Sequence, residues 1–335
     1  MLAYKKTYIK RRNAMLQSPY RKEWSASTSI AKSFIGTSVG SRIPTVKEYA
    51  ELFSCSRGIV QNALAFLEER NVIVLEKQGK KGTFLIEKNE KALFACSGLT
   101  NLTASMPPPL NLHLAGLATG ICQGMNRCEI PFTFAFVQGA KNRAEALLRG
   151  SYDFVVTTQY SAKVQMAKYE ELEIAFPFIG CEYSLPYKLY INKPGKAQIE
   201  DGMTIAVDPT SSDQIELTRQ VCADKKVHII EMPLISSVYA FYKGVVDCII
   251  FRDGLEDSSQ NLLNSALQHE HCIPKSQISV LPLHSDKINE MQIPVALVSR
   301  KNYGIDGILK NYISDGAVSD IQKNVLSGKM APQFY

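Results

Sequence analysis

The residues best suited to binding chemistry lie at two places in the C-terminal part of the chain. Thr210–Ser212 stands at the expected start of a helix, where hydroxyls and free backbone N–H groups form a natural anion site. Arg252 follows an apolar run and could pair with a carboxylate or a phosphate. Together they predict a pocket for a small anionic metabolite. Two simpler interpretations stay open: the serines could only cap the helix, and Arg252 could form a surface salt bridge with Asp253 or Glu256.

Catalytic chemistry is poorly represented. The chain lacks the motifs GxxxxGK[ST] and HExxH, and it has no metal-type cluster of Cys and His. His269-Glu270-His271 is the densest group of metal-ligand types, but its neighbours indicate a helix end or a loop. Cys181 and Cys248 could act as nucleophiles, although neither has an obvious basic partner. We therefore expect no catalytic residue, no metal and no cofactor, and a protein that is not an enzyme.

The elements that must position the anion-binding residues form a repeated pattern. The first pass is predicted as strand 110–116, helix 117–127, strand 132–139, helix 140–149 and strand 153–157. The second is predicted as strand 203–209, helix 211–223, strand 227–233, a helix from residue 235 and strand 246–251. Both passes have the β-α-β-α-β order of a parallel, doubly wound sheet.

The two passes also resemble each other in sequence. LLRGSYDFVV at 147–156 aligns with FYKGVVDCII at 241–250, 94 residues later. In both, a Gly ends a helix and an Asp opens a buried strand. Two similar α/β lobes place a ligand cleft between them, at the carboxyl ends of the strands. The positions predicted to line it are Gly116, Thr119, Gln138, Thr157, Thr158, Thr210, Ser211, Ser212, Arg252 and Asp253.

The first 91 residues differ in charge from the rest. They carry 17 Lys and Arg against 8 Asp and Glu, a net charge of +9, whereas the remaining residues carry 21 against 24, a net charge of −3. A basic N-terminal region on a slightly acidic body predicts a polyanion partner for that region alone.

The same region has the pattern of a helix-turn-helix followed by a hairpin. Residues 45–53 and 57–70 each place apolar side chains on one helix face, and Ser54–Ser56 separates them. Thr45 and Glu48 form a capping box, and Ser56 is a suitable N-cap. Strands at 72–76 and 83–86 flank a turn at 78–82 whose tip is basic. This order predicts a winged helix, whose second helix enters the major groove.

The stretch IPTVKEYAELFSCSRGIVQNALAFLEERNVIVLEKQGKKGTFL resembles the winged helix-turn-helix domain of GntR-type transcription regulators. The resemblance implies a DNA-binding homodimer on a palindromic operator. It also implies three basic contact positions. Arg57 matches one, whereas Lys47 and Gln61 replace the arginines that are usual at the other two. The residues expected at the DNA are Lys47, Ser56, Arg57, Gln61, Asn62, Lys80, Lys81 and Gly82.

Gln61 and Asn62 are expected to change the base preference. Arg pairs with guanine O6 and N7, whereas Gln and Asn pair with adenine. We therefore expect an operator that departs from the common family pattern. Basic residues before the domain, between Lys5 and Arg12, could add contacts to the DNA backbone or form a plain solvated extension.

The rest of the chain resembles the type II periplasmic-binding-protein fold, as reused in LysR-kind effector domains. The marks are the two Gly-x-x-Asp-strand units, PYKLYIN at 186–192 and PVALVSRKN at 294–302. The combination with a GntR-like region resembles the YhfZ group of bacterial regulators. The expected fold class is a multidomain chain: an N-terminal winged helix-turn-helix (1–91, with its basic tail), a linker (92–109) and a C-terminal α/β bilobal domain (110–335), with lobe I at 110–186 and 300–335 and lobe II at 193–292.

Cellular location follows from what the chain lacks. No stretch approaches the roughly 18–20 continuous apolar residues of a membrane span, and no secretory signal opens the sequence. The eight cysteines form no CxxC pair. We expect a cytoplasmic transcription regulator with double-stranded operator DNA and a small anionic effector as its partners. The alternative is a bilobal solute-binding protein or enzyme with a vestigial DNA-binding region.

Overall fold

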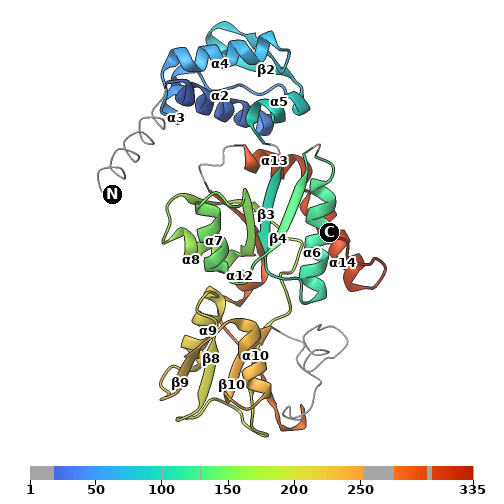
Figure 1. Ribbon diagram of the computed structural model, residues 1–335. Helices are drawn as coiled ribbons and strands as arrows, with labels where there is room; N and C mark the ends of the chain where they lie inside the picture. The colour runs from blue at the N-terminus through green and yellow to red at the C-terminus, as the bar shows by residue number, and fades with distance from the viewer. Residues whose placement is uncertain (1–18, 100, 129, 253–274, 300–303, 335) are drawn as a thin grey trace, which may run out of the picture. The chain divides into compact units, whose positions relative to one another are not determined.

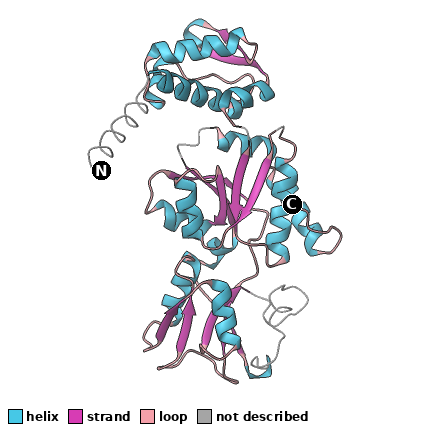
Figure 2. Cartoon of the chain, in the orientation of Figure 1, coloured by secondary structure: helices cyan, strands magenta, loops and turns pink. Residues whose placement is uncertain are grey.

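The structure is a computed structural model that describes residues 19–99, 101–128, 130–252, 275–299 and 304–334 (Figures 1 and 2). By contacts it divides into two units. The head comprises residues 1–101, 129–131 and 303–311, and the body comprises residues 102–128, 132–302 and 312–335. Three features of the sequence lie outside the described residues: the basic tail between Lys5 and Arg12, the residue Asp253, and the group His269–His271.

The head contains the predicted helix-turn-helix and hairpin. Its elements are α2 (Pro19–Gly36), α3 (Val46–Leu52), α4 (Arg57–Glu69), β1 (Ile73–Lys77), η1 (Gly79–Lys81), β2 (Thr83–Lys88) and α5 (Glu90–Ser97). The predicted capping box is confirmed, because the Glu48 N–H donates to Thr45 Oγ1 at 3.2 Å and the Thr45 N–H donates to Glu48 Oε2 at 2.6 Å. The predicted N-cap Ser56 is also confirmed, since its Oγ accepts from the Ile59 N–H.

The core of the head forms around Tyr49. Its ring stacks on Phe53 with centroids 5.8 Å apart and lies 6.4 Å from Phe34 of α2, and all but 1% of the residue is buried. Val60 and Leu67 of α4 are buried on the same side of that helix. This leaves the opposite face of α4 open to solvent.

A C-terminal helix also belongs to the head. Residues 303–311 cluster with it, and they include most of α13 (Ile305–Tyr312). The backbones of Gly36 and Gly307 approach so closely that a Cβ on Gly36 would lie 2.8 Å from the Gly307 Cα. Residues 300–335 are predicted to belong to lobe I, but of the described helices in this stretch only α14 (Asp315–Leu326) packs there, against α6 (Leu112–Met125).

The first lobe of the body is built on a five-stranded sheet of order β4-β3-β5-β12-β6. β3 runs parallel to β4 and β5, whereas β12 runs antiparallel to β5 and β6. The elements of this lobe are β3 (Leu102–Met106), α6 (Leu112–Met125), β4 (Phe132–Phe136), α7 (Ala140–Leu148), β5 (Phe154–Thr158), α8 (Gln159–Met166), β6 (Leu172–Pro177), β12 (Pro294–Ser299) and α14.

The strand predicted at 110–116 is wrong. This segment opens helix α6, whose N-cap Asn111 accepts from the Leu114 N–H at 2.9 Å, and the first strand is β3 instead. Because nearly every side chain of α6 is buried, its apolar residues are not confined to one face of the helix. The segment therefore lacks the helical periodicity that would distinguish it from a strand. Residues 92–109 are predicted to form a linker. Helix α5 and strand β3 occupy much of this segment instead.

The second lobe has a sheet of order β11-β7-β10-β8-β9. β8 runs parallel to β9 and β10, whereas β7 runs antiparallel to β10 and β11. Its elements are β7 (Tyr187–Ile191), β8 (Thr204–Val207), α9 (Ser212–Val221), β9 (His228–Glu231), α10 (Leu234–Tyr242), β10 (Cys248–Arg252), η2 (Lys275–Gln277), β11 (Ser279–Pro282) and α12 (Ile288–Gln292).

The sequence similarity between residues 147–156 and 241–250 has a structural cause. Asp153 Oδ2 accepts from the backbone N–H and the hydroxyl of Thr103, at 2.8 and 3.1 Å. Asp247 Oδ2 accepts from the same two groups of Thr204, both at 2.8 Å. In each lobe the Asp before the last parallel strand thus fixes the start of the first one. Equivalent residues perform the same task in both lobes.

Glu216 of α9 predicts an acid sensitivity of the second lobe. Hydrogen bonds from Arg219, Lys287 and Gln220 lower the pKa of Glu216 from 4.5 to about 2. Its stabilising effect is therefore complete above pH 4.5 and is lost as the pH falls towards 2. We expect the melting temperature of wild type, followed by circular dichroism, to fall between pH 4.5 and 2.5 by about 3 °C more than that of Glu216→Gln. Equal falls would contradict this role.

Candidate functional sites

The second helix of the helix-turn-helix presents polar side chains to solvent. Arg57 and Gln61 lie one turn apart on α4, and Asn62 is next to Gln61; all three are exposed. Val60 and Ala63 point into the core and hold the helix in place. The exposed face therefore carries donors and acceptors that can reach base edges.

The remaining predicted DNA contacts surround this helix in sequence. Lys47 on α3 is exposed and lies 3.9 Å from Glu51, a contact too weak and too solvated to hold it. Lys80 and Lys81 form the exposed tip of the wing, defined as β1, η1 and β2. Gly82 has φ of +100°, and a Cβ there would lie 2.7 Å from Arg42 Nε, so the turn requires glycine. The position of Arg42 beside this turn was not predicted from the sequence.

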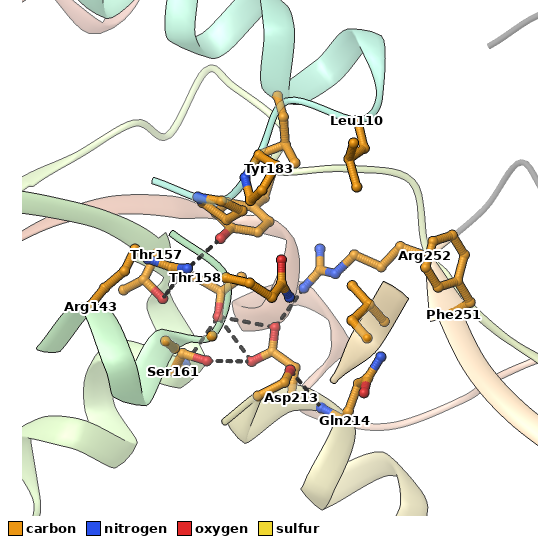
Figure 3. Close-up of a pocket in the computed structure, with 18 of the residues that line it drawn as sticks. Leu110, Arg143, Thr157, Thr158, Ser161, Tyr183, Asp213, Gln214, Phe251 and Arg252 are labelled. Atoms are coloured by element: carbon orange, nitrogen blue, oxygen red, sulfur yellow. Dashed lines mark hydrogen bonds and ion pairs between the residues drawn. The ribbon is translucent and has the colours of Figure 1, made fainter. Parts of the chain in front are cut away.

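The body contains a pocket lined by residues of both lobes (Figure 3). It encloses about 760 Å³, counting its open mouth. Of the predicted ligand-binding residues, the structure brings together Gln138, Thr157, Thr158, Ser211 and Arg252. The residues that sequence reasoning missed include Asn111, Arg143, Ser161, Tyr183, Tyr187, Asp213 and Gln214.

Gly116 and Thr119 do not line this pocket, because the strand that was to carry them is the helix α6. A Cβ on Gly116 would lie 2.9 Å from the Gln322 Cα, so this glycine allows α14 to approach. Thr119 Oγ1 donates to the Ala115 carbonyl at 2.8 Å and accepts from the Gln333 N–H at 2.9 Å. Both residues serve helix packing in this structure.

The predicted anion site at the start of α9 is largely occupied by its own contacts. Thr210 donates from its N–H and hydroxyl to Asp208 Oδ1, at 2.8 and 2.6 Å, and it does not line the pocket. Ser212 Oγ is buried and accepts from Gln165 Nε2 at 3.2 Å. Ser211 Oγ caps the helix by accepting from the Gln214 N–H at 3.4 Å, although the residue also lines the pocket.

Arg252 is held by a buried acid. Its Nη2 lies 2.6 Å from Oδ2 of Asp213, a residue of α9, whereas Asp253 and Glu256 lie outside the described residues. The guanidinium also donates to Ser184 Oγ at 2.8 Å and to the Met291 carbonyl at 2.7 Å. The Tyr187 ring lies 4.1 Å from its central carbon. Arg252 therefore has little capacity left for a ligand.

Asp213 connects the two lobes. Its carboxylate accepts from the hydroxyls of Thr158 at 3.0 Å and Ser161 at 2.8 Å, both at the start of α8 in the first lobe. It also accepts from Tyr187 at 3.3 Å and pairs with Arg252, both in the second lobe. Figure 3 shows the contacts of Thr158, Ser161 and Arg252 meeting at Asp213. This single buried acid joins hydrogen-bond donors of both lobes.

Arg143 of α7 is the other charged residue of the pocket. It is only 2% exposed; Nη1 donates to the Val137 carbonyl at 2.7 Å, and Nη2 lies 3.4 Å from Thr157 Oγ1 and 3.3 Å from the Tyr183 hydroxyl. Its Nε has no hydrogen-bond partner. Burial lowers the pKa of Arg143, which stays a cation because arginine is so basic.

The apolar walls of the pocket come from Leu110, Leu114, Leu234 and Phe251, and the neutral amides of Asn111 and Gln138 add donors and acceptors. The amide of Gln214 is held by the Asp208 N–H and the Ile250 carbonyl. A pocket with apolar walls and a few convergent polar groups suits a small molecule. Among the described residues, no group of His, Cys, Asp and Glu could hold a metal ion.

Two known protein families match this chain, one over the C-terminal residues and one over the helix-turn-helix. Residues 89–334 match the family described as the YhfZ C-terminal domain. The chain belongs to the YhfZ family. Residues 38–85 match a helix-turn-helix domain, which agrees with the capped helix pair and the turn between them.

Known YhfZ proteins resemble this chain over most of its length. The uncharacterized protein YhfZ of Escherichia coli strain K12 is 26% identical over 315 residues, covering 94% of this chain and 98% of that protein. The crystal structure of YhfZ from Shigella flexneri, 24% identical, has a TM-score of 0.56 and covers 72% of this chain and 97% of that one. This likeness shows a shared fold.

A weaker likeness reaches outside the family. The periplasmic aliphatic sulphonate binding protein SsuA from Escherichia coli has a TM-score of 0.46 and 16% identity, covering 69% of this chain and 71% of that one. Within the described part of the chain, none of the helices has the length and apolar character needed to cross a membrane.

Proposed function

We propose that this protein is a cytoplasmic transcription regulator whose head binds operator DNA and whose body binds a small anionic metabolite. The observation that carries the proposal is the helix-turn-helix domain with Arg57, Gln61 and Asn62 exposed on its second helix. These three side chains are of the types that pair with base edges, and a helix that presents them to solvent can insert into the major groove.

The head binds DNA as a GntR-like winged helix in a homodimer. Arg57 contacts a guanine, and Gln61 with Asn62 contacts adenine, while Lys80 and Lys81 of the wing contact phosphates. Two copies related by a two-fold axis bind two half-sites, so the operator is palindromic.

The body acts as a bilobal effector domain of the type II periplasmic-binding-protein kind. The pocket supports this role, since residues of both lobes line it and Asp213 joins the lobes at its floor. A ligand that prefers one arrangement of the lobes can shift their equilibrium. The two arginines of the pocket against one acid favour an anionic ligand.

The chain offers a route from the pocket to the head. Asn111 and Leu114 line the pocket at the start of α6, and α6 packs against α14. α14 follows directly on α13, which packs in the head where Gly307 meets Gly36. A shift of α6 on ligand binding would thus pull on the head through a covalent connection.

The alternative enzymatic role has little support. Burial raises the pKa of the Cys181 and Cys248 thiols to about 12, so neither provides a thiolate nucleophile at neutral pH. A solute-binding protein with a vestigial head remains the rival proposal, and it requires that the head has no affinity for a defined DNA sequence.

The experiment has two arms. Selection of DNA from a randomised duplex pool by the full chain tests the head, and recovery of a two-fold-symmetric motif is the expected result. A thermal-shift screen of the same protein against a metabolite collection tests the body. Recovery of unenriched DNA would refute the proposal that the head recognises an operator. The absence of any stabilising metabolite would refute the proposal that the body binds an effector.

Gln61→Arg is predicted to change the base preference of the head. An arginine at this exposed position of α4 can form two hydrogen bonds to guanine, so one base pair in each half-site should shift from adenine to guanine by about tenfold. Repeating the selection with the variant measures the shift. Glu68→Gln, which raises the net charge by the same one unit near the far end of α4, should leave the motif unchanged. The same shift in both variants would indicate a pure charge effect.

A further inference from the structure

Arg143 carries a buried charge with which no acid in the described part of the chain forms an ion pair. Among the described residues its guanidinium contacts only a carbonyl and two hydroxyls, and two of these three hydrogen bonds are longer than 3.2 Å. A buried cation without a counter-ion costs free energy, since the protein neither solvates it fully nor neutralises it. Its presence on the pocket wall therefore requires an explanation other than stability.

The other charges of the pocket are already balanced. Among the described residues, the charged side chains that line it are Arg143, Arg252 and Asp213. Asp213 and Arg252 form a 2.6 Å pair, so the ligand-facing charge that remains is the single positive charge of Arg143. Burial raises the pKa of Tyr183 and Tyr187, and both phenols are neutral.

Asp208 lies near enough to influence Arg143 but does not pair with it. Oδ1 of Asp208 accepts from the N–H and the hydroxyl of Thr210, and its Oδ2 accepts from the Leu234 N–H at 3.3 Å. Asp208 does not line the pocket. Its negative charge is therefore held by the turn after β8 and by the start of α10, and it is not available to a ligand.

We propose that Arg143 binds the carboxylate of the effector, and that the effector is a hydroxylated monocarboxylate. This inference rests on the proposed effector-binding function of the body and specifies its ligand class. A carboxylate that enters the pocket would accept from Nη2 of Arg143, where the long bonds to Thr157 and Tyr183 are easily exchanged. The hydroxyl groups of the ligand would be recognised by the neutral amides of Asn111 and Gln138.

The same balance of charges disfavours other ligand classes. A second carboxylate would meet Arg252 only by displacing Asp213, which would leave a buried acid unpaired. A cationic ligand would meet the uncompensated charge of Arg143 and no free carboxylate among the described residues that line the pocket. A neutral polyol would leave Arg143 as unpaired as it is without a ligand. Selectivity by charge is therefore the property that distinguishes this proposal.

The test uses the full chain and compounds that differ in charge on one carbon skeleton. The probes are glycerate, tartronate and glycerol, and gluconate, glucarate and glucitol, all as sodium salts where charged. Isothermal calorimetry measures their dissociation constants for wild type, Arg143→Met, Arg143→Lys and Arg149→Met. Arg149 is the matched control, because it ends the same helix but is exposed and lies outside the pocket.

In at least one series the monocarboxylate should bind wild type at least tenfold more tightly than the dicarboxylate and the polyol. Arg143→Met should weaken it at least tenfold, Arg143→Lys should weaken it less, and Arg149→Met should have no effect. If Arg143→Met does not fold, Arg143→Lys decides, because it keeps the charge and loses the planar fork.

Three results would overturn the inference: preference for a dicarboxylate or a polyol, monocarboxylate binding that Arg143→Met and Arg143→Lys leave unchanged, or binding in neither series. Each would leave the proposed function standing if the wider metabolite screen still finds a stabilising ligand of another class. If that screen also finds none, the effector-binding function itself fails.

Discussion

Asp213→Ala is expected to lower the free energy of unfolding of the body by about 3–5 kcal/mol, the usual cost of leaving one member of a buried ion pair alone. Asp213 is 3% exposed and its carboxylate neutralises Arg252 at 2.6 Å. The substitution leaves that guanidinium buried between two tyrosine rings without a counter-ion. It also removes the acceptor that the hydroxyls of Thr158 and Ser161 share.

Urea denaturation of the full chain, followed by circular dichroism, measures this loss. Asp320→Ala is the matched control. Asp320 is 78% exposed, and its contact with Lys323 is long, at 3.9 Å. Its removal should therefore change the free energy of unfolding by less than about 0.5 kcal/mol. The double variant Asp213→Leu, Arg252→Met should recover part of the loss, since it removes both charges. A loss below about 1 kcal/mol for Asp213→Ala would mean that the buried carboxylate of Asp213 does not stabilise the body.

Arg57→Ala is expected to weaken binding to the selected operator by about ten- to a hundredfold, the worth of one good bidentate contact with guanine. Arg57 is the first residue of α4 and is exposed, so its removal costs the fold little. Fluorescence anisotropy with the selected duplex at near-physiological salt measures the change.

Arg70→Ala is the control for Arg57→Ala. It removes the same charge from the residue that ends α4, where the guanidinium lies 4.5 Å from the Phe66 ring centroid. This variant should weaken operator binding less than threefold. Comparable losses in both variants, or equal losses on the operator and on random DNA, would show that Arg57 contributes only charge.

The head was predictable because its signals are local. The capping box at Thr45 and Glu48, the N-cap Ser56 and the apolar faces of α3 and α4 lie within a few residues of one another, and each appears in the structure. Helix α2 was not predicted, although it supplies Phe34 to the core. Nor could the sequence indicate that α13, more than 200 residues further on, packs in the same unit.

The pocket was only partly predictable, because its chemistry depends on contacts between distant segments. Arg252 was identified, but its partner Asp213 lies 39 residues earlier and looks in the sequence like an ordinary acid in the first turn of a helix. Arg143 was missed, although a signal existed: it lies three residues after Ala140 and four before Leu147, on the buried face of α7. A charged residue in such a face indicates a buried polar function.

The central claim is that the head recognises a specific DNA sequence. The most direct test compares the affinity of the full chain for the selected duplex with its affinity for a duplex of scrambled motif, at near-physiological salt. The account predicts binding at least about a thousandfold tighter to the selected duplex. Equal affinity for the two duplexes would contradict it, because the exposed face of α4 would then contribute positive charge and no base recognition.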